Sequence, residues 1–201
     1  MAVNLQKGQK VDLTKGRSGL REVIVGLGWD EVEQDRSFFG SLFSKPKPPI
    51  DCDASAIVCG PDGKLSQASD IVYFGNLTHR SGCIIHKGDN LTGEGKGDDE
   101  QIVVKLDTMP PNVSKIVFVV NIFQASARQQ HFGLIKSAFI RVVDASTHEE
   151  LCRYNLSEKT YDGMTAMIFG ELYRYQNEWK FSAIGEATRD DSIKDLSLRF
   201  R

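Results

Sequence analysis

The run KIVFVVNI (115–122) decides the fold, because its apolar residues are continuous instead of alternating with polar ones. Successive side chains of a strand point to opposite faces of the sheet, so a run of this kind indicates a strand that is covered on both sides. Valine, isoleucine and phenylalanine also favour strands. The run therefore predicts a central strand with packed material above and below its sheet.

Similar short runs recur along the chain between Gly, Asn, Asp and Pro residues, a pattern typical of many strands joined by turns. Residues 145–148 and Asn177 are expected to form hairpin connections. One helix is expected at 124–136, where Ser126 can cap its start. The other predicted strands are 22–29, 54–59, 70–75, 82–85, 101–106, 137–144, 149–156, 166–176 and 178–186.

These patterns predict a mostly β fold, a two-sheet β-sandwich with one or two short helices. A length of 201 residues is near that of one ordinary domain, so residues 1–201 are expected to form a single domain. The prolines at 46, 48 and 49 exclude a central strand from the segment 35–50, which we interpret as an insertion. Its phenylalanines either pack against the sandwich or contact a membrane or a protein partner.

The overall charge excludes some classes of partner. The 25 Lys and Arg residues nearly balance the 27 Asp and Glu residues, so the net charge of −2 gives no overall positive field that would attract nucleic acid, and any electrostatic function must be local. No apolar run is long enough for a transmembrane segment, and the first residues lack the apolar core of a secretion signal. We therefore expect a cytoplasmic protein, whose four cysteines stay as thiols.

The most unusual stretch is GDNLTGEGKGDDE (88–100), which contains five carboxylates, four glycines and one lysine. Carboxylates this close repel one another unless a cation or water screens them. Ca²⁺ accepts six to eight oxygen ligands in a tolerant geometry, and glycines let backbone carbonyls turn inward. The stretch therefore predicts a calcium site.

The expected ligands come first from this acidic loop itself. Its side-chain oxygens belong to Asp89, Asn90, Asp98, Asp99 and Glu100. Because one loop rarely completes the shell, we expect further ligands from neighbouring strands, in the order Asp53, Asp70 and Asp30.

The sequence also contains parts of two other metal-binding patterns. Asp89 and Glu100 have the spacing of the first and last ligands of an EF-hand loop, but Leu91 and Gly93 stand where that loop needs oxygen ligands. His79, Cys83 and His86 have a spacing that suits part of a zinc site, but no fourth ligand follows nearby. Neither pattern replaces a calcium-binding loop between two strands.

The order of these segments resembles the TerD family of tellurium-resistance and general stress proteins. The resemblance rests on LQKGQKVDLTK, VGLGWD, DCDASAIV, DIVYFGN, the acidic loop and GELYRYQNEWKF, and it covers nearly the whole chain. It implies a calcium-binding β-sandwich that holds two Ca²⁺ ions close together, a role in resistance to tellurite and other stresses, and partners among proteins of the same operon, some of them at the membrane. The insertion at 35–50 and Lys96 depart from the family pattern.

Two functions from different classes remain open. The first is a non-enzymatic calcium-binding stress protein, in which the ions order one face of the sandwich for a partner. The alternative is a metal-dependent enzyme that acts on a phosphorylated or oxyanion substrate. The sequence favours the first, because it contains no nucleophile or general-base motif.

Overall fold

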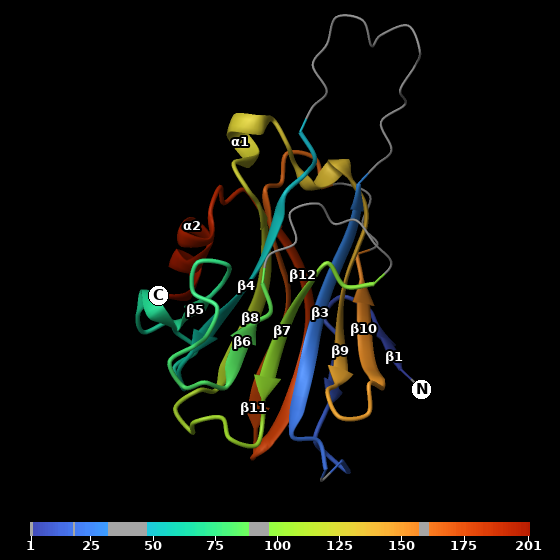
Figure 1. The fold of residues 1–201 in the computed structure, drawn as a ribbon, viewed down its shortest axis with the longest axis vertical. Coiled ribbons are helices and arrows are strands. Elements are labelled where there is room, and N and C mark those ends of the chain that lie inside the picture. The colour runs from blue at the N-terminus through green and yellow to red at the C-terminus, as the bar shows by residue number, and fades with distance from the viewer. Residues whose placement is uncertain (1, 18, 32–47, 89–96, 157–160) are drawn as a thin grey trace, which may run out of the picture.

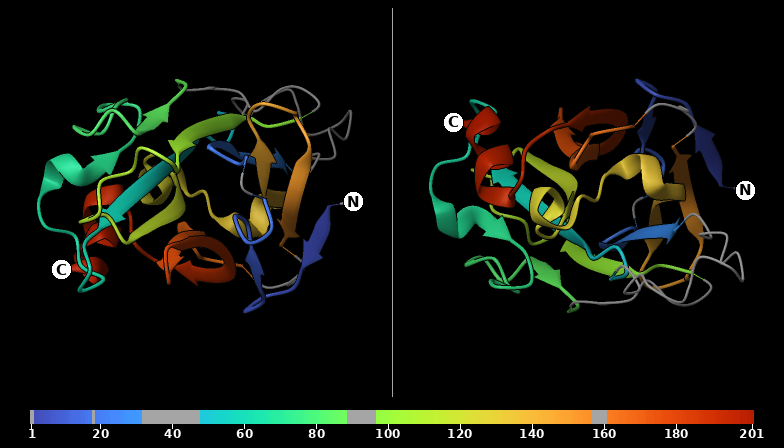
Figure 2. Two further views of the ribbon diagram at one scale, coloured as in Figure 1. Left: turned by 90° about the horizontal axis from the view of Figure 1, so that it is seen from below. Right: turned by 90° about the horizontal axis from the view of Figure 1, so that it is seen from above.

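The computed structural model describes residues 2–17, 19–31, 48–88, 97–156 and 161–201. Within them the chain forms two six-stranded sheets that pack as two layers (Figures 1 and 2). The strand order of the first sheet is β1 (Val3–Leu5), β10 (Glu150–Asn155), β9 (Ile135–Asp144), β3 (Glu22–Glu31), β7 (Glu100–Lys105) and β6 (Ile84–His86). The strand order of the second is β2 (Lys10–Asp12), β12 (Glu178–Thr188), β11 (Ala166–Tyr175), β8 (Lys115–Ile122), β4 (Cys52–Cys59) and β5 (Ile71–Val72).

The predicted β-sandwich is therefore confirmed, and the run that predicted it lies inside the second sheet. That run is β8, which pairs antiparallel with β4 on one side and β11 on the other. Every residue of β8 except Lys115 is buried. Its inward side chains, such as Phe118, join the core between the sheets, and outward ones such as Val119 join a second apolar cluster.

This second cluster explains why a strand of one sheet is apolar on both faces. Leu196 of α2 (Ile193–Ser197) is buried in the cluster, and Phe200 of η3 (Leu198–Phe200) packs against it. Figure 1 shows α2 beside the second sheet, next to the C-terminus. The C-terminal segment thus covers part of the outer face of β8 and β4.

The expected helix at 124–136 is wrong in its length. The helix α1 covers only Ala125–Arg128, and the residues on either side, Gln124 and Gln129, have left-handed backbone conformations. The following residues form the 3₁₀ turn η2 (Phe132–Leu134) and then enter β9. Burial of Phe132 and pairing of β9 with β3 override the helical preference of this segment.

Other expectations on local structure also need correction. Ser126 does not cap α1; its hydroxyl donates to Asp191. The predicted strand 70–75 is reduced to β5, preceded by the 3₁₀ turn η1 (Ala68–Asp70). The three-residue strands β1 and β2 were not predicted, because they are too short to show a periodic pattern. Residues 35–47 of the insertion and residues 89–96 of the acidic loop lie outside the described residues.

The cysteines fit the interpretation as buried thiols. All four are buried and free of disulfide bonds. Burial raises the pKa of the Cys59 thiol to about 11 and that of Cys152 to about 12. In the part of the chain that the structure describes, no helix is both long and apolar enough to cross a membrane.

The hairpin between β11 and β12 gives a test of the fold. Tyr175 pairs with Glu178, and the two residues between them, Gln176 and Asn177, both have positive φ, as a type I′ turn requires. Glycine is favoured at the second position, so Asn177→Gly should raise the free energy of unfolding by about 0.5 kcal/mol. Urea denaturation measures this. Glu178→Gly, in the adjoining strand, should lower the free energy of unfolding. An equal change in both variants would contradict the assigned turn.

Candidate metal centre

The end of the acidic loop lies across the outer face of β3. The backbone N–H of Asp99 donates to the carbonyl oxygen of Leu27 at 2.8 Å. A Cβ on Gly28 would lie 2.9 Å from the carbonyl oxygen of Gly97, and a Cβ on Gly26 would overlap the carboxylate of Asp98. The two glycines of the GLG sequence in β3 thus leave room for the loop to cross.

Asp98 is neutralised by an arginine of the neighbouring strand. Arg141 of β9 donates from Nε to Oδ1 at 2.6 Å and from Nη2 to Oδ2 at 3.0 Å, so the pair is bidentate. Gln101 donates to Oδ2 at 2.9 Å. The Asp98 side chain is buried, and Arg141 also contacts Glu150. Its carboxylate is therefore held by protein donors on the outer face of the first sheet.

Glu100 points the other way and joins the two sheets. Its Oε2 accepts the backbone N–H of Ala54 in β4 at 2.6 Å and lies 3.3 Å from Nε2 of His86. The same nitrogen lies 3.1 Å from the carbonyl oxygen of Ala54. Gly88 N–H donates to Nδ1 of His86, so the neutral ring carries its proton on Nε2 and donates it into this bridge.

Asp99 lies between these two anchored carboxylates. Its Oδ2 accepts the backbone N–H of Trp29 at 2.7 Å, and among the described residues it has no ion-pair partner. Burial, the largest cause, and the negative charges of Asp30, Asp98 and Glu100 together raise the pKa of Asp99 to about 6, against the lowering effect of the hydrogen bond from Trp29. The half-buried Asp99 therefore carries repulsion that a cation would relieve.

Asp30 and Asp53 flank this group on opposite sheets. Asp30 is exposed one residue before the end of β3, and Ser137 donates to its Oδ2 at 2.6 Å. Asp53 is buried in β4, next to the residue that Glu100 contacts, and Nδ2 of Asn121 lies 3.5 Å from its Oδ2. Both expected ligands thus lie at the same end of the sandwich as the acidic loop.

Asp70 lies elsewhere, in a separate group. It directly precedes Ile71, which pairs with Ile57, so it lies at least four residues along β4 from Asp53, or roughly 13 Å. His79 and Arg80 contact its Oδ1 at 3.2 and 3.1 Å. Asp70 is thus neutralised away from the acidic loop.

The three residues with zinc-like spacing do not converge either. Nδ1 of His79 lies 2.8 Å from the hydroxyl of Ser81, which accepts the N–H of Cys83 and so closes a local turn. The Cys83 thiol donates to the carbonyl oxygen of Thr108, and His86 belongs to the bridge between the sheets. Each of the three has a different partner.

The described residues alone do not form a complete metal site. Among them, no three His, Cys, Asp or Glu side chains converge as a metal-binding group. Asp89 and Asn90, the first expected ligands of the loop, lie outside the described residues. What the described part contributes is the half-buried carboxylate of Asp99, whose pKa is raised by its burial and by the nearby acids Asp30, Asp98 and Glu100.

Comparison with known proteins agrees with the resemblance. Residues 1–200 match the TerD domain. The chain belongs to the TerD family. It is 50% identical over 200 residues to the stress response protein SCP2 of Bacillus subtilis, which covers 100% of both chains. It is 45% identical over 186 residues to the tellurium resistance protein TerD of Serratia marcescens, covering 92% of this chain and 91% of that protein.

Solved structures agree on the TerD fold. A protein of unknown function, SAV2460, superposes with a TM-score of 0.65 at 22% identity, covering 91% of this chain and 99% of that one. A homologue of the telluride resistance protein TerD from Streptomyces coelicolor A3(2) superposes with a TM-score of 0.61 at 24% identity, covering 88% and 95%.

Sequence reasoning missed four residues that position the acids in this TerD-family chain. They are Gly26, His86, Asn121 and Arg141. Asn121 had a local signal, since it is the one polar residue inside the run IVFVVNI, and buried polar residues are informative. Arg141 and His86 had none, because only the pairing of β9 with β3 and of β6 with β7 brings them to the loop.

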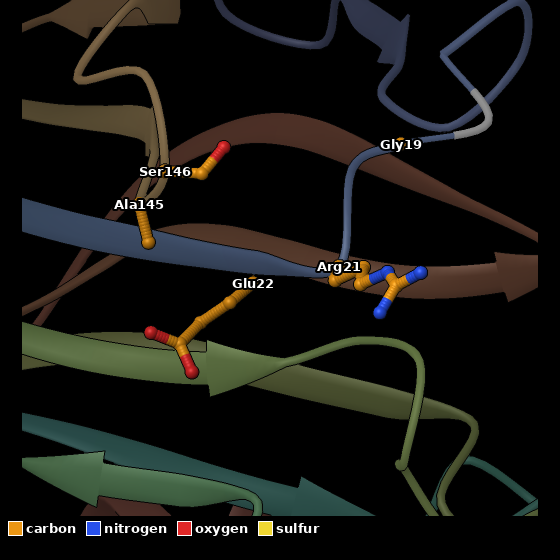
Figure 3. A pocket seen from close by; sticks show the side chains of 5 residues that line it. All are labelled: Gly19, Arg21, Glu22, Ala145 and Ser146. Atoms are coloured by element: carbon orange, nitrogen blue, oxygen red, sulfur yellow. The ribbon is translucent and has the colours of Figure 1, made fainter.

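A pocket at the other end of β3 adds nothing to this centre. It is lined by Gly19, Arg21, Glu22, Ala145 and Ser146. Figure 3 shows the Arg21 and Glu22 side chains pointing in different directions, so the pocket lacks converging polar groups.

The crossing of the acidic loop over β3 can be tested at Gly26. Gly26→Ala should displace the carboxylate of Asp98 from Arg141 and lower the free energy of unfolding by about 2 kcal/mol. Gly19→Ala is the matched control, because a Cβ there meets nothing within 4 Å. Chemical denaturation compares the two, and equal stability of both variants would contradict the crossing.

The raised pKa of Asp99 predicts a dependence of stability on pH in the metal-free protein. The folded-state pKa of about 6 exceeds the ordinary value of 3.8, so folding favours the protonated acid. This stabilisation is complete below about pH 4 and is lost as pH rises through 6. Because Asp99 is partly exposed, the loss is discounted to roughly 1 kcal/mol. Denaturation between pH 4 and 7.5 in chelator measures it, and Asp99→Asn should remove this part of the pH dependence.

Proposed function

We propose that this TerD-family protein binds Ca²⁺ at the acidic loop and acts in stress and tellurite resistance as a binding protein, not as an enzyme. The observation that carries the proposal is Asp99, a half-buried carboxylate whose pKa is raised by burial and by three neighbouring acids. A divalent cation at this position would favour the ionised form of Asp99 and convert the repulsion into attraction.

Ca²⁺ suits the available donors better than a softer metal. The candidate ligands are hard oxygens: carboxylates of Asp99 and the loop, the amide of Asn90, and backbone carbonyls between glycines. Calcium accepts such ligands in variable number, whereas zinc prefers nitrogen and sulfur. The names of relatives support the wider role, since they include stress response and tellurium resistance proteins.

The surface that the ion would order is the outer face of the first sheet. Asp98 is fixed to Arg141 over Gly26, one residue away from Asp99. Ion binding at Asp99 would therefore hold the crossing segment against β3 and fix the charged row of Arg141, Glu150 and Arg153. We propose that proteins of the same resistance system, in the cytoplasm or at the membrane, recognise this face in the calcium-bound state.

A thermal unfolding experiment tests calcium binding. Ca²⁺ at a hundredfold excess over Kd should stabilise the folded protein by about 2.7 kcal/mol relative to protein in chelator. Asp99→Asn should raise stability in chelator at neutral pH, because it removes a repelled charge, and should abolish most of the gain from Ca²⁺. Asp107→Asn, at an exposed position after β7, is the matched control and should behave as wild type.

Two outcomes would contradict the proposal. Equal melting temperatures in chelator and in millimolar Ca²⁺ would exclude a calcium-binding protein. As a control for ion selectivity, Mg²⁺ at the same ionic strength should stabilise the folded protein less than Ca²⁺ does, because Mg²⁺ requires a stricter octahedron and keeps its waters. Turnover of a panel of phosphate esters that is lost in Asp99→Asn would instead support a metal-dependent enzyme.

A further inference from the structure

We propose that Ser81 is a covalent modification site, whose hydroxyl accepts an acyl group from an activated acyl donor such as an ester with a good leaving group. His79 acts as the general base, and Asp70 positions His79. The inference does not rest on calcium binding. Ser81 lies in the turn before β6, and β6 and its neighbour β5 are the edge strands of the two sheets.

A chain of hydrogen bonds joins the three side chains. Oγ of Ser81 lies 2.8 Å from Nδ1 of His79, and Nε2 of the same ring lies 3.2 Å from Oδ1 of Asp70. The backbone N–H of Ser81 also donates to Nδ1, at 3.3 Å. Nδ1 is therefore the acceptor nitrogen, and the neutral ring carries its proton on Nε2, facing Asp70. This is the arrangement of a hydroxyl nucleophile with its base and an orienting acid.

The carboxylate of Asp70 favours the protonated ring that forms when His79 takes the hydroxyl proton. His79 and Asp70 are each 4% exposed, so solvent screens their interaction weakly. Arg80 also contacts Oδ1 of Asp70, at 3.1 Å, but its side chain is 57% exposed and its charge is screened more strongly. Asp70 can therefore still stabilise a positive charge on His79.

The turn stabilises the attacking oxygen but offers little to a reaction intermediate. The N–H of Cys83 donates to Oγ of Ser81 at 3.2 Å, which favours negative charge on that oxygen as its proton leaves. The N–H of Gly82 donates to the carbonyl oxygen of His79, and that of Ser81 donates to Nδ1. Because these N–H groups are already used within the turn, the site suits a single acylation and not enzymatic turnover.

The solvent side of the turn is open to a small acyl donor. Ser81 is half-buried between two exposed residues, Arg80 and Gly82. A Cβ on Gly82 would meet nothing within 4 Å. The positive charge of Arg80, next to Ser81 in sequence, also suits a donor whose leaving group is an anion.

The reaction needs only the acyl donor. A bond forms between Oγ of Ser81 and the acyl carbon, and the bond from that carbon to the leaving group breaks. The hydroxyl proton passes to Nδ1 of His79 and then to the leaving group or to water. No oxidant or reductant takes part.

Reaction of the full-length protein with p-nitrophenyl acetate tests the proposal. Wild type should release one nitrophenolate per chain in a fast phase, and peptide mass mapping should find the acetyl group on Ser81. Ser81→Ala should abolish the fast phase, and His79→Gln should slow it about 100-fold, since it removes the base. Ser146→Ala is the matched control and should react as wild type does, because the Ser146 hydroxyl donates to a carboxylate, that of Asp144, and not to a histidine.

The dependence of the rate on pH separates a base from a structural histidine. In wild type the acetylation of Ser81 should speed up as pH rises and level off once His79 is neutral. Asp70→Asn should slow the reaction and start the plateau at lower pH, because a neutral amide does not stabilise the protonated ring. If this variant or His79→Gln does not fold, Ser81→Ala and the wild-type pH profile decide the question.

Three results would overturn the inference. They are acetylation of Ser81 no faster than that of Ser146, an unchanged rate in folded His79→Gln, and a wild-type rate that follows hydroxide without a plateau. The measurements are made equally in chelator and in Ca²⁺, so their failure would leave the proposed function standing.

Discussion

Repulsion among three consecutive carboxylates at the start of β7 is the constraint on which the rest of this centre depends. Each of the three carboxylates is stabilised by different contacts. Asp98 pairs with Arg141 on the outer face of the first sheet, and Glu100 takes two donors from the bridge between the sheets. Asp99, between them, receives one backbone N–H and keeps a pKa of about 6. The fold thus holds a carboxylate where its charge is unfavourable without a cation.

Through Asp98 and Glu100, the carboxylate group is also connected to both sheets of the sandwich. Asp98 fixes the loop across β3, and the glycines at 26 and 28 make that crossing possible. Glu100 and His86 satisfy the N–H and carbonyl groups of Ala54, where β4 extends past its pairing with β5. A change in the charge of Asp99 therefore acts on both sheets at once. In the proposed function, ion binding at Asp99 would act on the face offered to a partner through these contacts.

Much of the fold was predictable, because it follows from apolar patterns. KIVFVVNI predicted β8 with its boundaries, and the turn at Asn177 was predicted from its flanking strands. The helix at 124–136 was mispredicted, because burial of Phe132 and the register of β9 outweigh local propensity. At the site, the sequence identified the acids but not how each is held. Arg141 is 43 residues from Asp98 in sequence, and only tertiary structure joins them.

The central claim is that a captured cation relieves the repulsion at Asp99. Carbon-13 NMR of its carboxyl group, followed against pH, measures this directly. In chelator the account predicts a pKa near 6, and in saturating Ca²⁺ a pKa below the ordinary 3.8. A pKa near 3.8 that Ca²⁺ does not change would contradict the account.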